Sequence, residues 1–110
     1  MVVAFKSLTL VANLHKIVKL IMSTRFDLGL VVMTRTAADT FSRREMLTCL
    51  ARHSRCDWGD LCASDKKSND LAVEFGDRIL SSYILDNGRK MWIITEADRS
   101  STTILLPSDY

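Results

Sequence analysis

All three cysteines of this 110-residue chain, and one of its two histidines, lie in a single short segment. The stretch LTCLARHSRCDWGDLCASD, residues 47–65, places Cys49, His53, Cys56 and Cys62 in the pattern Cys-x3-His-x2-Cys-x5-Cys. Thiolate and imidazole groups are preferred zinc ligands, and a thiol beside an imidazole can also act as a nucleophile. The segment could therefore be a zinc site, a catalytic site, or the sulfur-rich end of a helix.

The spacing favours the helix end, and we predict no metal site and no cofactor. Most structural zinc sites combine CxxC-type pairs from two segments, and no CxxC pair exists here. Cys49 and His53, four residues apart, would share a helix face without a third group to orient them. We expect Cys49 to pack as a small apolar side chain. We expect His53 to cap the helix C-terminus or lie on the surface there, where the helix dipole favours an imidazolium.

The sequence DWGDL places an indole between two acids and beside a flexible glycine. Tryptophan is enriched among the residues that dominate protein–protein binding. Asp57, Trp58 and Asp60 could therefore form a partner-binding corner. The same tryptophan could instead pin a turn between two helices onto a sheet.

A second polar group follows in TEADRSS, where Glu96, Asp98 and Arg99 stand at the end of a strand-like run. Carboxylates with an arginine could support general acid–base chemistry or bind phosphate. The same residues are equally ordinary in a polar turn between strands. We therefore predict no catalytic residues and a binding surface formed by Asp57, Trp58, Asp60, Asp98 and Arg99. In an alternative enzymatic interpretation, Glu96 and Arg99 would be catalytic.

A strand and two helices are expected before and within the cysteine-rich segment. Residues 26–34 (FDLGLVVMT) alternate apolar side chains and predict a strand. TAAD from Thr36 and SRRE from Ser42 match the capping-box pattern. This pattern predicts a short helix near 37–41 and a firmer one near 43–54.

A further helix is expected over residues 65–75. Its apolar positions predict that Leu71, Ala72 and Phe75 face inward. Gly76 stands where a left-handed terminating residue belongs.

The last third of the chain is typical of strands. RILSSYIL (78–85) and KMWIITEA (90–97) are separated by DNGR, in which Asn87 and Gly88 favour a tight hairpin because both can take positive φ. TTILL (102–106) follows. The order predicts an α+β fold with an N-terminal strand, two to three helices and then a three-stranded antiparallel meander, the helices packing on one face of a four-stranded sheet.

Length and charge predict one domain without a general affinity for nucleic acid. The 110 residues are 47% hydrophobic and 25% charged, as in ordinary globular proteins. Residues 1–22 carry three lysines and no acid, a charge of +3, so the other 12 basic and 13 acidic residues give −1. This composition does not predict a nucleic-acid partner, although it leaves room for a local basic patch. An odd number of cysteines fits reduced thiols in the cytoplasm.

Residues 1–22 form an apolar, basic segment distinct from the domain expected over 23–110. The segment could be a helix docked on the core, a translated leader before a natural start at Met22, or an amphipathic helix on an anionic membrane surface. Its longest uncharged run, about nine residues, is too short to cross a bilayer, so we predict no transmembrane segment. Oligomeric state is not predicted.

The phrases DWG, WIITEADRS and TTILLP stand within the longer stretches DWGDLCASDKKSND and GDRILSSYILDNGRKMWIITEADRSSTTILLPSDY. On these, residues from about Phe26 to Tyr110 resemble a group of small bacterial proteins of unassigned function, carried by plasmids and integrated mobile elements and sometimes encoded beside restriction–modification genes. The resemblance implies no catalytic residue. Cys56 and Cys62 depart from its pattern, where polar or small residues would be expected.

Element order gives a second likeness, to RelE/ParE-type toxins, which also run strand, two helices, three strands. The toxins that cleave messenger RNA rely on a strongly basic sheet face, whereas this domain is about neutral. We therefore expect a non-enzymatic accessory protein of a mobile element that binds another protein, in a setting such as host defence or restriction. The alternative is a RelE-like ribonuclease that uses Glu96 and Arg99 with Arg78, Arg89 or Lys90.

Overall fold

The computed structural model describes residues 2–3 and 24–110, so most of the N-terminal segment, with its docking-helix, leader and membrane interpretations, lies outside the described residues. The helices are α2 (Arg35–Thr40), α3 (Arg43–Ser54) and α4 (Ala63–Phe75). The strands are β1 (Val2–Val3), β2 (Leu30–Thr34), β3 (Ile79–Ile84), β4 (Lys90–Thr95) and β5 (Ser101–Leu105). Two turns of 3-10 helix, η1 (Asp86–Gly88) and η2 (Pro107–Asp109), follow β3 and β5.

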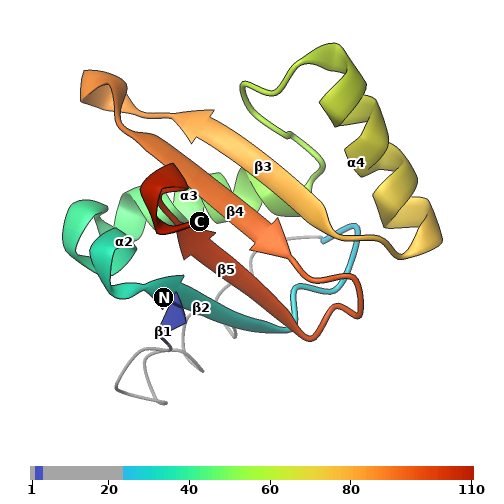
Figure 1. Ribbon diagram of the computed structural model, residues 1–110, viewed down its shortest axis with the longest axis horizontal. Coiled ribbons are helices and arrows are strands. Elements are labelled where there is room, and N and C mark those ends of the chain that lie inside the picture. Colours follow the sequence, from blue (N-terminus) through green and yellow to red (C-terminus); the bar gives the residue numbers. More distant parts are fainter. Residues whose placement is uncertain (1, 4–23) are drawn as a thin grey trace.

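The strands form one mixed sheet in the order β1-β2-β5-β4-β3 (Figure 1). β4 pairs antiparallel with both β3 and β5, whereas β2 pairs parallel with β5. The predicted α+β class is confirmed. The sheet differs from the predicted one, because the consecutive antiparallel strands β3, β4 and β5 are joined by β2, which pairs parallel with β5, and by β1 in one larger mixed sheet. Local patterning does not reveal this pairing, since parallel neighbours are joined by a long crossover and not by a hairpin.

β2 begins later than predicted, at Leu30 instead of Phe26. Phe26 and Leu28 are buried, but they lie before the strand. Gly29, which follows them, has a φ of +64°, and a Cβ there would lie 2.4 Å from backbone oxygens of the β4–β5 turn. The apolar alternation at 26–28 therefore reflects burial of a close-packed loop.

The helices after β2 begin at side-chain caps. Thr34 Oγ1 accepts a hydrogen bond from Ala37 N at 3.0 Å, so α2 begins before the position that a cap at Thr36 would predict. Ser42 and Glu45 form the predicted capping box at the start of α3, with Glu45 N donating to Ser42 Oγ at 3.0 Å and Ser42 N donating to Glu45 Oε1 at 2.9 Å. The buried residues of α3 are Met46, Cys49, Leu50, His53 and Ser54.

α4 lies along the outer edge of β3 (Figure 1), and its inward side differs from the predicted one. Of the three residues predicted to face inward, Ala72 is buried, whereas Leu71 and Phe75 are 47% and 69% exposed. Asn69 is buried instead, because its Nδ2 donates to Leu80 O at 2.7 Å and its Oδ1 accepts from Leu80 N at 3.3 Å. The amide satisfies the outward peptide groups of an edge strand. Gly76, with a φ of +78°, is the predicted left-handed helix end.

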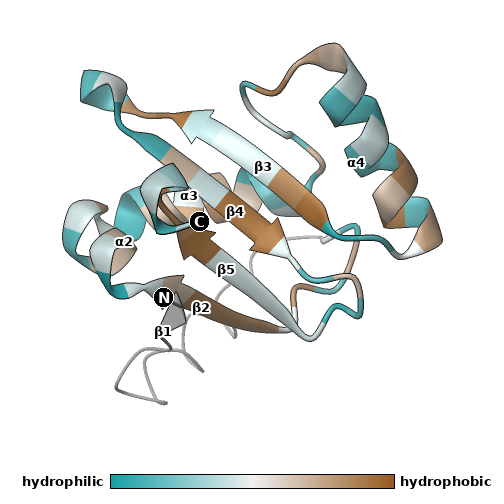
Figure 2. Ribbon diagram, in the orientation of Figure 1, coloured by the Kyte–Doolittle hydropathy of each residue, from teal (hydrophilic) through white to brown (hydrophobic). Residues whose placement is uncertain are grey.

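α3 and η2 lie on opposite sides of the sheet (Figure 1). Successive strand residues point to opposite faces, and alternate ones pack into the core with α3. Hydrophobic residues are concentrated along the strands, whereas η1 is hydrophilic (Figure 2). The strand residues of the core cluster are Val31, Met33, Ile79, Tyr83, Met91, Ile93 and Ile104.

Residues 57–60 cover another part of the outer edge of β3. Ser82 N donates to Trp58 O at 3.2 Å and Asp60 N donates to Ser82 O at 2.8 Å, so the segment pairs with β3 as an isolated parallel bridge at Gly59. Gly59 has a φ of +78°, and a Cβ there would lie 1.8 Å from Ser82 O. This close approach of two backbones requires glycine.

Gly59→Ala should lower the free energy of unfolding by about 2–4 kcal/mol, because the added Cβ forces the bridge to β3 apart. Gly88→Ala is the matched control, since Gly88 has a φ of +74° but no atom within 4 Å of an added Cβ. The control should lose only about 1 kcal/mol, from backbone strain alone. Urea denaturation measures both losses, and equal losses would contradict the role of the Ser82 contact.

Candidate functional site

His53 is fully buried near the end of α3, where it joins a chain of hydrogen bonds across the sheet. Its Nδ1 bonds Ser81 Oγ on β3, and its Nε2 lies 2.8 Å from Thr95 Oγ1 on β4. Thr95 Oγ1 lies 2.7 Å from Thr102 Oγ1 on β5, which donates to Leu28 O at 2.7 Å. The prediction that His53 caps the helix or lies on the surface is wrong, because the ring is fully buried and hydroxyl groups of β3 and β4 bond its two nitrogens in place of water.

The hydroxyl groups determine which nitrogen of His53 carries the proton. Thr102 uses its single hydroxyl hydrogen on Leu28 O, so it must accept from Thr95. Thr95 in turn must accept from His53, which places the proton on Nε2. Nδ1 is then the acceptor for Ser81. A neutral imidazole therefore satisfies every member of the chain.

Ser81 and His53 form a hydroxyl–imidazole pair of the kind that activates a serine nucleophile. Both residues are fully buried, so the pair does not face a substrate. Burial, together with the positive charge of Arg99, lowers the pKa of His53 from 6.5 to about 3. The arrangement links α3 to the sheet and offers no reactive group to solvent.

Trp58, the predicted centre of a binding corner, is buried. Its Nε1 donates to Asp70 Oδ1 on α4 at 2.9 Å, and its ring lies 6.2 Å from the ring of Phe26 and 5.8 Å from that of His53, between centroids. The indole therefore links residues 57–60 and α4 to the core. Because it is buried, it does not form part of the surface.

The two acids beside Trp58 remain nearer the surface, in ion pairs. Asp57 Oδ2 lies 2.7 Å from Arg52 Nε, and this guanidinium lowers the pKa of the Asp57 carboxyl. Asp60 Oδ2 lies 3.5 Å from Lys90 Nζ. Both acids help to hold the segment that covers β3.

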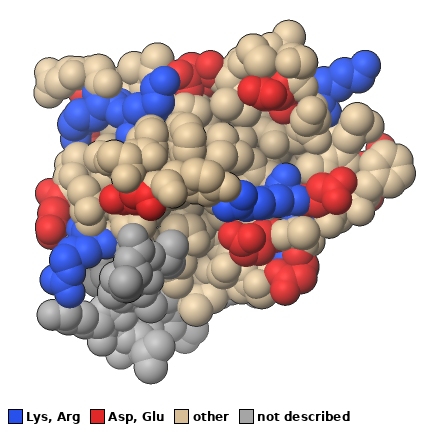
Figure 3. Space-filling model, viewed as in Figure 1, with Lys and Arg blue, Asp and Glu red and all other residues tan. Residues whose placement is uncertain are grey.

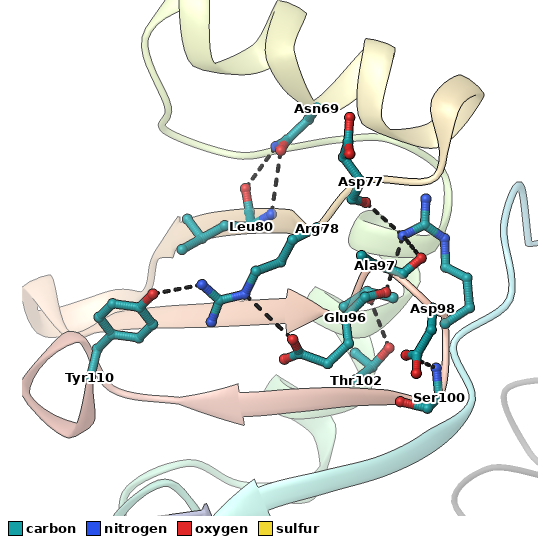
Figure 4. Close-up of polar contacts among 12 residues, drawn as sticks. Asn69, Asp77, Arg78, Leu80, Glu96, Ala97, Asp98, Ser100, Thr102 and Tyr110 are labelled. Atoms are coloured by element: carbon teal, nitrogen blue, oxygen red, sulfur yellow. Dashed lines mark hydrogen bonds and ion pairs between the residues drawn. The ribbon is translucent and has the colours of Figure 1, made fainter.

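Arg99 points inward from the β4–β5 turn and binds backbone oxygens. Its Nη1 donates to Asp77 O at 2.7 Å and to Glu96 O at 3.1 Å, and its Nη2 donates to Ala72 O at 2.8 Å. Its Cζ lies 5.7 Å from the ring centroid of Phe26, the ring that also neighbours Trp58. The buried Phe26 ring thus lies between Arg99 and Trp58, which belong to the two predicted binding regions. Asp98 is exposed, and its Oδ1 accepts from Ser100 N at 3.0 Å (Figure 4).

Of the residues of the alternative ribonuclease site, Arg78 and Arg99 lie beside Glu96, whereas Arg89 and Lys90 do not. Glu96 Oε1 lies 3.6 Å from Arg78 Nε, whereas Arg89 Nη2 lies 2.6 Å from Glu45 Oε2. Lys90 begins β4 and Glu96 follows its end, a separation of about 20 Å along the strand. Arg89 and Lys90 are therefore too far from Glu96 to act with it.

The cysteines do not converge with His53. Cys49 is buried, Cys56 half-buried and Cys62 exposed, and all three are free thiols. Burial raises the pKa of Cys49 to about 11 and also raises that of Cys56, so neither favours the thiolate. Among residues 2–3 and 24–110, no three His, Cys, Asp or Glu side chains are arranged to hold a metal ion.

The fold assembles one surface group that sequence reasoning missed. Arg78 precedes β3, Trp92 lies on β4, Glu96 follows β4, and Tyr110 follows η2. Arg78 Nη1 donates to Tyr110 OH at 2.6 Å, and the Arg78 side chain also pairs with Glu96 (Figure 4). The Tyr110 ring centroid lies 5.2 Å from Arg78 Cζ and 5.7 Å from the Trp92 ring. We call these four residues the Arg78–Tyr110 cluster.

Strand alternation is the signal that could have found Trp92. Met91 and Ile93 are buried in the core with α3, so Trp92 must point to the opposite face. No local pattern places Tyr110 beside it. On the face drawn in Figure 3, basic and acidic side chains are interspersed, and no continuous basic field is visible.

Comparison with family models, curated proteins and solved structures finds no match. In the part of the chain that the structure describes, no helix combines the length and apolar character that crossing a membrane requires. The candidate site therefore rests on the geometry of these side chains.

Acidification should destabilise the fold through His53. Its pKa is ordinary in the unfolded chain and about 3 in the fold, so the unfolded chain gains the proton first as the pH falls. The free energy of unfolding should decrease by about 1 kcal/mol per pH unit below about pH 6.5. Urea denaturation between about pH 6.5 and 5 avoids most carboxyl titration, and His53→Gln should remove the slope there. Persistence of the slope in this variant would contradict the assignment.

Arg99→Ala should lower the free energy of unfolding by about 2–3 kcal/mol, because several half-buried or exposed carbonyl groups lose a shared charged donor. Arg99→Lys should recover only part of the loss, since an ammonium lacks the planar fork of donors. Arg78→Ala is the comparison, because the Arg78–Glu96 pair is more than 40% exposed on each side and should contribute about 1 kcal/mol or less. Thermal and urea denaturation would refute the assignment if both alanine variants lost equal stability.

Proposed function

We propose that this chain is a non-enzymatic accessory protein that acts by binding another protein through the Arg78–Tyr110 cluster. The observation that carries the proposal is the meeting of an arginine, a tryptophan and a tyrosine on one face of the sheet. These three residue types are the most enriched among the residues that dominate interface energies. The resemblance supplies the proposed setting, a bacterial mobile genetic element whose product acts in the cytoplasm on a host defence or restriction system.

The cluster is ordered before any partner arrives. Tyr110 is 69% exposed, yet its hydroxyl accepts from Arg78 and its ring packs against Trp92. Side chains that are already held in place lose less conformational entropy when a partner covers them. This arrangement supports binding by preformed aromatic anchors.

Charge around the cluster supports a protein partner over a nucleic acid. Glu96 pairs with Arg78, and Asp98 lies nearby in the turn that follows β4 (Figure 4). An acid beside the arginine opposes the phosphate contacts on which nucleic-acid binding depends. The neutralised arginine can still stack on apolar and aromatic groups of a protein.

Affinity capture followed by measurement with the purified partner tests the proposal. Wild-type protein should retain one defined partner from bacterial cells, and Tyr110→Ala and Arg78→Glu should each weaken that binding by about tenfold or more. Arg43→Ala is the matched control, because Arg43 is also an exposed arginine but lies on α3. The control should bind as the wild type does.

Two outcomes would contradict the proposal. Equal binding by all four proteins would show that the cluster is not the contact surface. Growth and translation arrest on expression, lost in Glu96→Gln, would favour the ribonuclease alternative. Glu96→Gln is the sharper variant for that purpose, because Arg99 holds the fold through carbonyl groups.

A further inference from the structure

The outward side of α4 carries an apolar pair that neither the core nor the Arg78–Tyr110 cluster includes. Leu71 and Phe75 are four residues apart, so they lie one turn apart on the same side of the helix. Both are exposed, Phe75 more than Leu71. Apolar residues at this spacing form a stripe suited to packing against another helix. We call the two residues the apolar stripe.

The contacts of α4 keep the apolar stripe outside. Asn69 bonds both peptide groups of Leu80, and Asp70 accepts from Trp58 Nε1. Successive helix residues are about 100° apart, so the stripe lies away from Asp70, on the other side of the inward-facing residues. Turning the stripe toward the core would break all of these hydrogen bonds.

The charged residues beside the apolar stripe differ in sign along α4, whereas Asp65 and Asp70 lie on other sides of the helix. Lys66 and Lys67 lie in the N-terminal half, and Glu74 lies in the last turn. Lys67 and Glu74 are about two turns apart and therefore share one side of the apolar stripe. Neither forms an ion pair with a described residue. The small side chain of Ser64 lies in line with the stripe, about two turns before Leu71, and that of Ser68 lies on the side opposite Lys67.

We propose that two copies of this chain associate through α4, with the helices antiparallel about a two-fold axis beside Leu71. Leu71 would then meet its counterpart in the second copy, and Phe75 would pack against the turn that begins at Lys67. Each Lys67 would pair with Glu74 of the other copy, and the serines would allow close approach. A parallel arrangement would place the Lys67–Glu74 side of each helix against the serine side of the other and form no such pairs, so the charge order of the helix favours the antiparallel one.

The contact is small. A helix of 13 residues is about 20 Å long, so the pair buries less than the roughly 1,600 Å² of a standard interface. Association should therefore be reversible and concentration-dependent. Because the surface does not include the Arg78–Tyr110 cluster, failure of this proposal and failure of the proposed function are separate results.

Sedimentation equilibrium of the full chain, from about 10 μM to about 1 mM, tests the proposal. Wild-type protein should form dimers in this range. Lys67→Glu and Glu74→Lys should each weaken dimerisation by about tenfold, because each brings like charges together twice. An equimolar mixture of these two variants should dimerise as the wild type does, since every pair is again of opposite sign.

Lys66→Glu is the matched control, because it changes net charge as Lys67→Glu does but lies away from the apolar stripe. It should dimerise normally, whereas Phe75→Ser should not, and circular dichroism should show both folded. Wild-type protein that stays monomeric throughout would overturn the proposal. So would equal effects of Lys66→Glu and Lys67→Glu, or a mixture that fails to restore dimers.

Discussion

A neutral imidazole at His53 is hydrogen-bonded, directly or through hydroxyl groups, to every strand of the β3–β4–β5 side of the sheet. Its two nitrogens bond Ser81 and Thr95, and Thr95 passes the chain through Thr102 to the backbone of Leu28. The helix end, three strands and the loop before β2 are thus held in one relative position. An imidazolium in this site would be shielded from solvent and close to the positive charge of Arg99, so the arrangement depends on the ring remaining neutral.

The outer edge of β3 is the second constraint on the fold, because its peptide groups need hydrogen-bond partners from outside the sheet. Asn69 bonds the peptide groups of Leu80, and the backbone at Trp58 and Asp60 bonds those of Ser82. Both contacts satisfy groups that would otherwise pair with another chain. Covering the edge positions α4 beside the sheet, and that position leaves Leu71 and Phe75 facing outward.

Several side chains that the sequence suggested as catalytic or binding residues instead form hydrogen bonds within the fold. Arg99 binds carbonyl groups at the end of α4 and in the β4–β5 turn, and Trp58 donates to Asp70. Arg89 ties the hairpin after β3 to Glu45 on α3. Because these groups are occupied inside the chain, the surfaces that we propose for binding are the Arg78–Tyr110 cluster and the apolar stripe on α4.

Some features followed from the sequence alone because their interactions are local. Ser42 and Glu45 form a capping box across three residues, Gly76 ends its helix with positive φ, and Asn87 and Gly88 both take the positive φ expected of the hairpin. These are determined by backbone sterics and neighbouring donors. These local interactions determine where helices and turns begin and end, and they do not indicate which side chains bind a partner.

Tertiary structure decided the parallel pairing of β2 with β5, the burial of His53 and Trp58, and the inward direction of Arg99. Each depends on a partner distant in sequence, such as Thr95 for His53 or Ala72 for Arg99. A polar residue in a sequence has the same local pattern whether its partner is water, a ligand or a strand across the core. Only the folded chain supplies that partner, and here it supplied hydroxyl and carbonyl groups where the sequence suggested a surface.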